Sequence, residues 1–201
     1  MINRNRHEEA VRRLILIAAA SALTFVLALA IDTAFASMNR EKFAEGVVRA
    51  DGSLRVPDDF RETYAYLGSW AVADDVDTNG SIGLHVVYAQ RFAVRAHQQT
   101  GKFPDGTVLV KELFNGKSED LTTGRATSAN GVAGYFVMVK DTKGRFPENP
   151  LWGDGWGWSF FEAGSPEKAV TKDYTGECLA CHEPARQTDL VYDYAYPVLQ
   201  K

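Results

Sequence analysis

The feature that most constrains this chain is the segment Cys178-Leu179-Ala180-Cys181-His182, near its C-terminal end. In a Cys-x-x-Cys-His motif the two thiols are spaced to bond the two vinyl groups of one haem, and the histidine is placed to ligate the iron. The motif therefore predicts a covalently attached haem c, with Cys178 and Cys181 as attachment points and His182 as the iron ligand.

The alternatives for these cysteines are a redox dithiol, a structural disulfide and half of a zinc site. They are the only two cysteines of the chain. A zinc site needs four ligands, and outside the N-terminal segment only His85 and His97 accompany His182, without a ligand-like spacing. A thioredoxin-like dithiol occurs early, in a βαβ unit, whereas this motif comes late. We therefore favour haem attachment.

The N-terminal segment predicts export. Arginines precede an apolar run over residues 14–31, and Ala-Phe-Ala follows at 34–36, which is typical of a secretory signal and its cleavage site. We expect residues 1–36 to be the signal peptide and residues 37–201 to form one domain. The alternative is an uncleaved membrane anchor, since the run is near the lower length limit for spanning a bilayer. Covalent haem attachment in bacteria takes place outside the cytoplasmic membrane, so both versions predict a periplasmic domain.

The charge of the chain bears on its partners. The formal net charge is −4, and no segment has a basic stripe. We therefore expect no nucleic-acid partner.

After residue 60, short aromatic and β-branched runs alternate with Gly, Pro, Asn and Asp. This pattern predicts a mainly β (α+β) fold with an antiparallel sheet of about five strands, at residues 64–72, 84–90, 107–114, 135–140 and 156–161. Turn signals occur at Asn79-Gly80, Pro104-Asp105-Gly106 and Asn130-Gly131. Helices are few: residues 91–100, ended by Gly101, and a short helix around the haem motif.

This balance argues against two common kinds of haem protein. Small electron-transfer cytochromes c are helical with an early haem motif, and cytochromes c prime are four-helix bundles. The usual sixth ligand of the iron is also not evident, because Met38 lies near the expected new terminus and Met138 lies in a predicted strand. We therefore expect a five-coordinate iron with an open face.

The predicted strand 107–114 has two faces, each with one charged residue among apolar ones: Leu109, Lys111 and Leu113 on one, and Val108, Val110, Glu112 and Phe114 on the other. If both faces are covered, burial favours the neutral, nucleophilic amine of Lys111. The pattern alone favours instead an edge strand, with Lys111 and Glu112 pointing to water.

The chain resembles the cytochrome P460 family over most of residues 51–199. The matching stretches occur in family order and are Pro57-Asp58-Asp59-Phe60-Arg61, Val86-Val87-Tyr88, residues 100–107, Val110-Lys111-Glu112-Leu113, Lys172, the haem motif, Thr188-Asp189 and Tyr196-Pro197-Val198-Leu199. The resemblance implies a mainly β homodimer with a five-coordinate haem c, whose proximal ligand is His182. It also implies that Lys111 is bonded through its side-chain nitrogen to the edge of the haem, as a third link.

Members of this family oxidise hydroxylamine to nitrous oxide or nitric oxide and pass the electrons to an external acceptor, which we expect to be a small cytochrome. A carboxylate in the pocket assists proton removal. By spacing, Asp173 is the best match for this acid, with Glu112 and Asp154 as alternatives, although a solvated surface carboxylate is the ordinary role of each. Aromatic residues that either line the haem pocket or form ordinary core are Trp152, Trp156, Trp158, Phe160 and Phe161.

His85 departs from the family, which has arginine at this strand position. It is a candidate distal hydrogen-bond donor, a sixth ligand or an ordinary core residue. Two other functions stay open. One is nitric oxide binding, as in the β-type cytochromes c prime, which lack the lysine link. The other is plain electron transfer, which needs Met138 or His85 as the sixth ligand.

Overall fold

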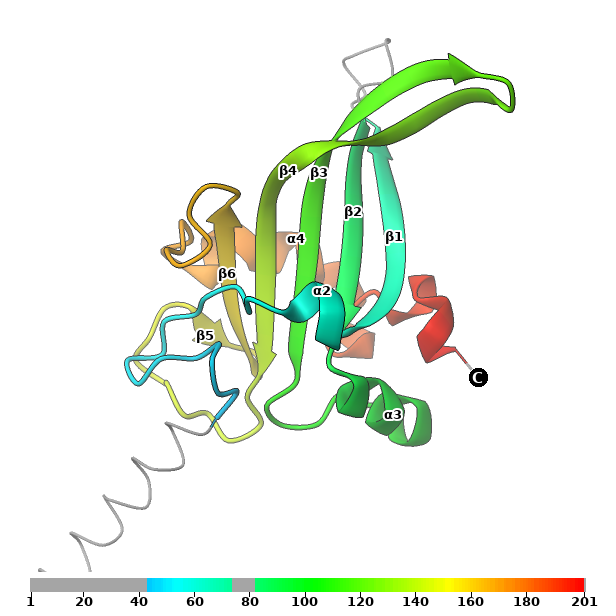
Figure 1. The fold of residues 1–201 in the computed structure, drawn as a ribbon. Helices are drawn as coiled ribbons and strands as arrows, with labels where there is room; N and C mark the ends of the chain where they lie inside the picture. The colour runs from blue at the N-terminus through cyan, green and yellow to red at the C-terminus, as the bar shows by residue number, and fades with distance from the viewer. Residues whose placement is uncertain (1–42, 74–81, 201) are drawn as a thin grey trace, which may run out of the picture. The chain divides into compact units, whose positions relative to one another are not determined.

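The chain forms one antiparallel sheet, seen in Figure 1, with the strand order β1-β2-β3-β4-β6-β5. The computed structural model describes residues 43–73 and 82–200. Its strands are β1 Ala65–Ala73, β2 Ile82–Ala89, β3 Val108–Leu121, β4 Gly124–Lys140, β5 Trp152–Gly153 and β6 Trp156–Glu162. The mainly β fold is therefore confirmed, with a short additional strand, β5, that pairs with β6.

Short helices accompany the sheet. They are α2 Phe60–Thr63, α3 Arg91–Thr100, η1 Thr175–Leu179, α4 Ala180–His182, η2 Glu183–Thr188, η3 Asp193–Ala195 and η4 Pro197–Leu199. The predicted helix 91–100 is confirmed as α3. It ends because Gly101 adopts a left-handed conformation with a φ of 72°, in which its N–H donates to the carbonyl of His97.

The β3–β4 hairpin differs from the prediction. The predicted turn at Asn130-Gly131 is wrong, because the chain reverses at residues 122–123 and both residues lie inside β4. They lie opposite the single residue Asn115 of β3, and Gly131 has a φ of 83°. The glycine therefore supplies the positive φ of a β-bulge instead of a chain reversal. Figure 1 shows the hairpin bending away from the rest of the sheet.

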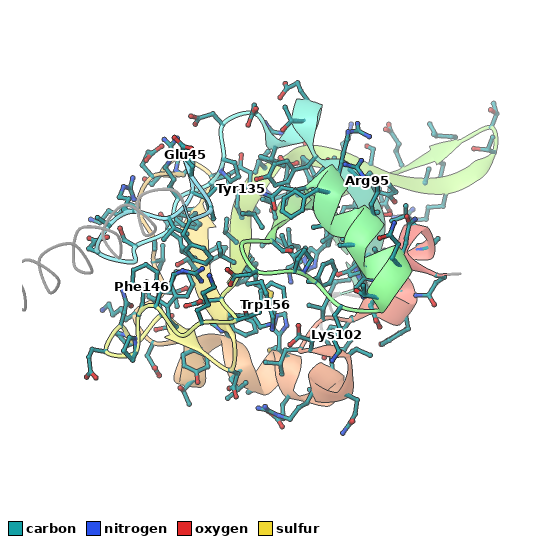
Figure 2. All side chains as sticks on the ribbon, turned by 90° about the horizontal axis from the view of Figure 1, so that it is seen from below. Glu45, Arg95, Lys102, Tyr135, Phe146 and Trp156 are labelled. Carbon is teal, nitrogen blue, oxygen red and sulfur yellow. The ribbon has the colours of Figure 1, made fainter. Side chains whose placement is uncertain are left out.

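Both faces of the sheet are covered. The first core packs beneath residues 43–58 and α2 and includes Phe43, Leu54, Phe60, Val108, Val110, Tyr135, Phe146 and Phe161. The second core packs beneath α3 and the C-terminal segments and includes Val94, Leu109, Trp156, Trp158, Leu190 and Leu199. Figure 2 shows Tyr135 and Phe146 of the first core and Trp156 of the second. The predicted alternation of side chains along this strand is confirmed, because Val108 and Val110 belong to the first core and Leu109 to the second.

β3 lies between β2 and β4, so the predicted edge strand is wrong. Glu112 is fully buried in the first core, and Arg61 of α2 donates to both of its carboxylate oxygens, with Nε 3.1 Å from Oε1. The same guanidinium also donates to the hydroxyl of Tyr135 at 3.2 Å. The buried charge is tolerated because it is paired and hydrogen-bonded. Lys111 points to the other face.

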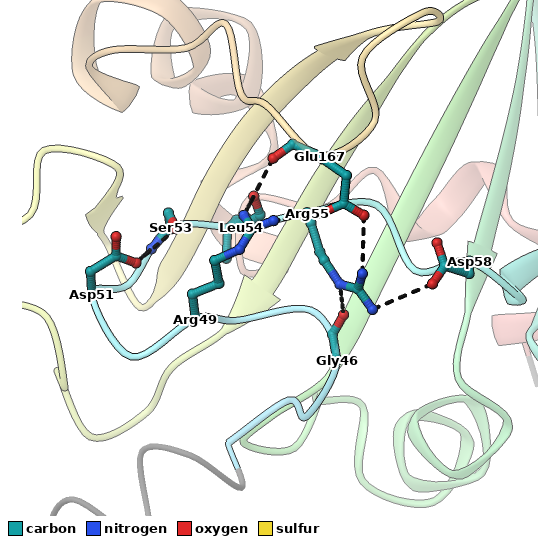
Figure 3. Close-up of polar contacts among 8 residues, drawn as sticks. All are labelled: Gly46, Arg49, Asp51, Ser53, Leu54, Arg55, Asp58 and Glu167. Atoms are coloured by element: carbon teal, nitrogen blue, oxygen red, sulfur yellow. Dashed lines mark hydrogen bonds and ion pairs between the residues drawn. The ribbon is translucent and has the colours of Figure 1, made fainter.

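Two arginines hold residues 46–58 against the loop that follows β6 (Figure 3). Arg49 and Arg55 both donate to the carboxylate of Glu167, and the Arg55 Nη1 lies 3.0 Å from Oε1. Leu54, between them, is fully buried. Exposed ion pairs of this kind add little free energy, so the buried leucine supplies most of the attachment.

Some predictions fall on residues outside the described part of the chain. These are the signal peptide at 1–36, Met38 and the turn at Asn79-Gly80. Within residues 43–73 and 82–200, no helix is both long and apolar enough to cross a bilayer.

Candidate functional site

The Cys-x-x-Cys-His motif lies on a helical segment that begins with one π-helical turn, η1, and continues as α4. A π-turn is rare and is frequently found at functional sites. Asp173 precedes the segment and accepts hydrogen bonds from the backbone N–H groups of Thr175 and Gly176, at 3.3 and 2.8 Å. The segment therefore starts at a carboxylate cap.

The two motif cysteines are both free thiols in the structure. Cys178 is buried and Cys181 is exposed. Burial raises the pKa of Cys178 to about 11, so its thiol stays protonated at neutral pH. Both side chains line the same cavity, which leaves them available for bonding to a group inside it.

The cavity has a volume of about 350 Å³ and a mainly apolar and aromatic lining. Strands β1, β2, β3, β4 and β6 contribute to it together with the haem-motif segment and the chain that follows. The polar side chains that bear on its chemistry are His85, Lys111, Glu177, Cys178, Cys181 and His182. The structure thus brings Lys111 close to Cys178, Cys181 and His182, although Lys111 is far from the motif in the sequence.

The ring of His182 has a defined tautomer. Its Nδ1 lies 2.7 Å from the carbonyl oxygen of Leu190, and because a carbonyl only accepts, Nδ1 carries the proton. Nε2 is then the unprotonated nitrogen that can ligate a metal. Burial lowers the pKa of His182, which favours this neutral form. The Trp158 ring packs edge-on against the imidazole, with the ring centroids 4.9 Å apart.

Lys111 lies on the cavity face of β3. Its Nζ is 4.6 Å from the centroid of the Phe136 ring and makes no hydrogen bond or ion pair within the described part of the chain. Burial lowers the pKa of Lys111, with the two cysteine thiols acting in the opposite direction. The amine is therefore closer to its neutral, nucleophilic form than a lysine in water.

The candidate acids lie in different places. Glu112 belongs to the first core, across the sheet from the cavity. Asp154 accepts hydrogen bonds from Arg186 and from the hydroxyl of Tyr174, and does not line the cavity. Asp173 is exposed and serves as the helix cap. Glu177 does line the cavity. Sequence reasoning missed it, although its position next to Cys178 was a usable signal.

His85 and Met138 both line the cavity. Burial lowers the pKa of His85, and the charge of Lys111 acts in the same direction. His85 is therefore neutral at neutral pH, and each of the two residues offers an atom with a free lone pair. Their position keeps both of them available as a sixth ligand.

The aromatic residues of the cavity were only partly foreseen. Of the five candidates, Trp158 lines the cavity and Trp156 packs beside it in the second core. Trp152 and Phe161 belong to the first core, and Phe160 packs against Phe136. Other aromatic side chains of the lining come from β1, β4 and the C-terminal segment: Trp70, Phe136, Tyr192 and Tyr196.

These side chains fit a covalently bound haem c. Two free thiols, separated by two residues, and an unprotonated imidazole nitrogen face one apolar cavity. This is the donor set that two thioether bonds and one iron bond need. The hydrogen bond at the other ring nitrogen is the usual companion of a ligating histidine.

Comparison with known families gives one match. The sequence model of the family described as cytochrome P460 matches residues 57–193, which is more than half of the chain. The matched range contains β1–β6 and every polar residue named above for the cavity. A comparison with curated proteins finds no match.

Proposed function

Because this chain belongs to the cytochrome P460 family, we propose that it is a mono-haem c oxidoreductase that converts hydroxylamine to nitrous oxide or nitric oxide. The observation that carries the proposal is the presence of Lys111 in the same cavity as Cys178, Cys181 and His182. Family membership implies haem c with iron, and the cavity has the donors for it. The proposal adds the lysine link and the substrate.

In this proposal Cys178 and Cys181 form the thioether bonds, and His182 ligates the iron through Nε2. Once bound, the haem supplies an iron that takes up hydroxylamine and accepts its electrons. Trp158 and the Leu190 carbonyl hold the plane of the His182 ring. The apolar lining excludes water from the open side of the site.

Lys111 is the proposed third link. Attachment replaces both thiols with thioethers, which cannot ionise, so neither cysteine can then raise the pKa of Lys111. Burial alone then acts on the amine and favours its neutral form. A neutral amine beside the macrocycle is the species that can bond to the haem edge. Joining its nitrogen to a ring carbon breaks one N–H and one C–H bond and releases two protons and two electrons, so the link needs a two-electron oxidant such as a peroxide.

A carboxylate is needed to receive the proton lost by hydroxylamine. Asp173 is the acid proposed by spacing, and Glu177 is the carboxylate that lines the cavity. Asp173 and Glu177 both lie at the start of the helical segment that contains the haem motif. They are also linked, because Glu177 Oε1 accepts hydrogen bonds from the backbone N–H groups of Lys172 and Asp173, at 3.1 and 3.4 Å.

The second candidate function is nitric oxide binding or electron transfer without the lysine link. The mainly apolar lining favours a small uncharged gas, and the presence of His85 and Met138 in the lining favours a sixth ligand. Both versions keep the thioether bonds and His182 but lack the Lys111 link of the first proposal. The electron-transfer version also needs His85 or Met138 as a sixth ligand.

The proposal includes the cellular location and the partners of the protein. We propose that residues 1–36 direct export, that the domain works in the periplasm as a homodimer, and that a small cytochrome accepts the electrons. If the signal is not cleaved, the same domain is anchored to the membrane.

The experiment measures the rate at which the haem-loaded protein oxidises hydroxylamine. A soluble redox dye accepts the electrons, and its reduction gives the rate. Wild type should turn over, and Lys111→Met should lose most of this activity while keeping its haem. Lys168→Met, at an exposed lysine, is the control and should behave as wild type. A wild-type protein that binds nitric oxide tightly and does not oxidise hydroxylamine would support the second candidate.

A further inference from the structure

Two consecutive residues near His182 have a strained backbone. Asp189 has a φ of 59° and Leu190 a φ of 63°, in the left-handed region. A bulky side chain such as leucine rarely adopts this conformation, because Cβ approaches the following carbonyl oxygen. Such strain persists only where the surroundings hold it, and it is concentrated at functional sites.

The surroundings of this turn are well defined. The Leu190 side chain is buried in the second core, and its N–H donates to the carbonyl of Ala185 at 2.8 Å. The Asp189 carbonyl accepts the indole N–H of Trp156 at 3.0 Å. The Asp189 carboxylate accepts a hydrogen bond from the ammonium group of Lys140 at 2.7 Å. Trp156 and Lys140 therefore hold the turn from the sheet, and Ala185 holds it from η2.

Lys140 reaches the turn from the end of β4. It is buried, and its Nζ also lies 4.8 Å from the centroid of the Trp156 ring. The ion pair is only partly buried, because 37% of the Asp189 side chain is exposed, so it adds little to stability. It does fix geometry, because breaking it leaves an unpaired charge. The placement of Lys140 therefore suits a positioning role better than a purely stabilising one.

The turn is connected directly to the proposed iron ligand. The Leu190 carbonyl, which the strained φ aims at the motif, accepts the hydrogen bond from His182 Nδ1 at 2.7 Å. The contacts Lys140–Asp189, Asp189–Leu190 and Leu190–His182 thus join the end of β4 to the imidazole ring.

We propose that Lys140 and Asp189 are positioning residues that hold the Leu190 carbonyl against His182 and thereby tune the haem iron. The inference rests on the proposed attachment of haem through His182. A hydrogen bond from a ligating imidazole to a carbonyl increases the basicity of the ligating nitrogen and fixes the ring orientation. A stronger donor stabilises the ferric state, so the ion pair keeps the reduction potential low.

The test uses haem-loaded protein without substrate and compares wild type with Lys140→Met and Asp189→Asn. The readouts are the iron–histidine stretching frequency of the ferrous protein, by resonance Raman spectroscopy, and the reduction potential. Both variants should lower the frequency and raise the potential, because the carbonyl is no longer held. Lys140→Arg, which keeps the cation, should stay near wild type and serves as the conservative control. If Lys140→Met does not retain haem, Asp189→Asn carries the test.

Arg61→Met is the matched control, because it breaks the partly buried ion pair with Glu112 on the opposite face of the sheet. It should reduce stability and leave both readouts unchanged. The proposal is overturned if Lys140→Met and Asp189→Asn only reduce stability and keep the wild-type frequency and potential. Neither readout needs turnover, so a protein that fails to oxidise hydroxylamine would refute the proposed function and leave this test intact.

Discussion

The Nζ of Lys111 lies 4.6 Å from the centroid of the Phe136 ring, on the face of the sheet that also holds the cavity. The two residues are cross-strand neighbours in β3 and β4. The aromatic face keeps the amine inside an apolar space in which it has no hydrogen-bond or ion-pair partner in the described part of the chain. This contact therefore positions the group that we propose to bond to the haem.

Phe136→Leu should reduce the fraction of protein that has the lysine link, because the amine loses the ring that holds it in the cavity. The thioether bonds should form as in wild type. Phe160→Leu is the control, since Phe160 packs on Phe136 with ring centroids 4.7 Å apart but lies on β6, which β4 separates from the strand of Lys111. The two fractions are measured from the Soret bands, and equal values in both variants would rule out a positioning role for Phe136.

Arg61→Met should destabilise the fold, because it leaves the fully buried carboxylate of Glu112 without its partner. We expect the free energy of unfolding to fall by about 2–3 kcal/mol, less than for a wholly buried pair because Arg61 is half-exposed. Denaturant unfolding at pH 7 measures the change.

The double variant Arg61→Met with Glu112→Gln removes both charges and should recover part of that loss. A double variant that is no more stable than Arg61→Met would show that the paired charges are not the source of the effect.

Asp173 can be tested as a cap and as a proton acceptor in one series. Asp173→Asn keeps a good helix cap, whereas Asp173→Ala removes the cap and should cost about 1 kcal/mol of stability. If Asp173 accepts the substrate proton, both variants lose hydroxylamine oxidation. Activity that survives in Asp173→Asn would leave the residue as a cap and direct attention to Glu177→Gln.

Asp105 should contribute to stability against acid. Burial alone would raise its pKa, but hydrogen bonds from Arg145 and Thr142 outweigh burial and lower the pKa to about 2. Because the folded-state pKa is lower than the unfolded one, the contribution is complete above about pH 4 and is lost as the pH falls towards 2.

Between about pH 4 and pH 2, the free energy of unfolding should therefore fall less steeply in Asp105→Asn than in wild type. Asp120→Asn, at an exposed residue, removes the same charge and serves as the control. Parallel curves for wild type and Asp105→Asn across this range would contradict the assignment.

Much of the sheet could be predicted from the sequence, because alternation and β-branched composition are local signals. The positions of α3 and of all the main strands follow from such signals. The β3–β4 hairpin could not be placed in this way, since Asn130-Gly131 has the same turn-forming chemistry in a bulge as in a chain reversal. Only the pairing with Asn115 distinguishes the two.

The parts of the candidate site that form one sequence segment could be predicted, and the parts that depend on contacts between distant residues could not. The Cys178 to His182 motif is a single segment with a fixed chemistry. The burial of Glu112 depends on Arg61, far away in the sequence, so the strand pattern wrongly suggested an exposed edge. The turn at Asp189 and Leu190 has no glycine to reveal its left-handed backbone.

The most direct test of the central claim is the visible absorption spectrum of the dithionite-reduced protein. Wild type should show a Soret band strongly shifted to the red of ordinary haem c. Lys111→Met should show the ordinary band, and so should Lys111→Arg, because a guanidinium stays protonated and cannot bond to the haem. An ordinary Soret band in wild type, unchanged by Lys111→Met, would contradict the lysine link and leave a gas-binding or electron-transfer protein.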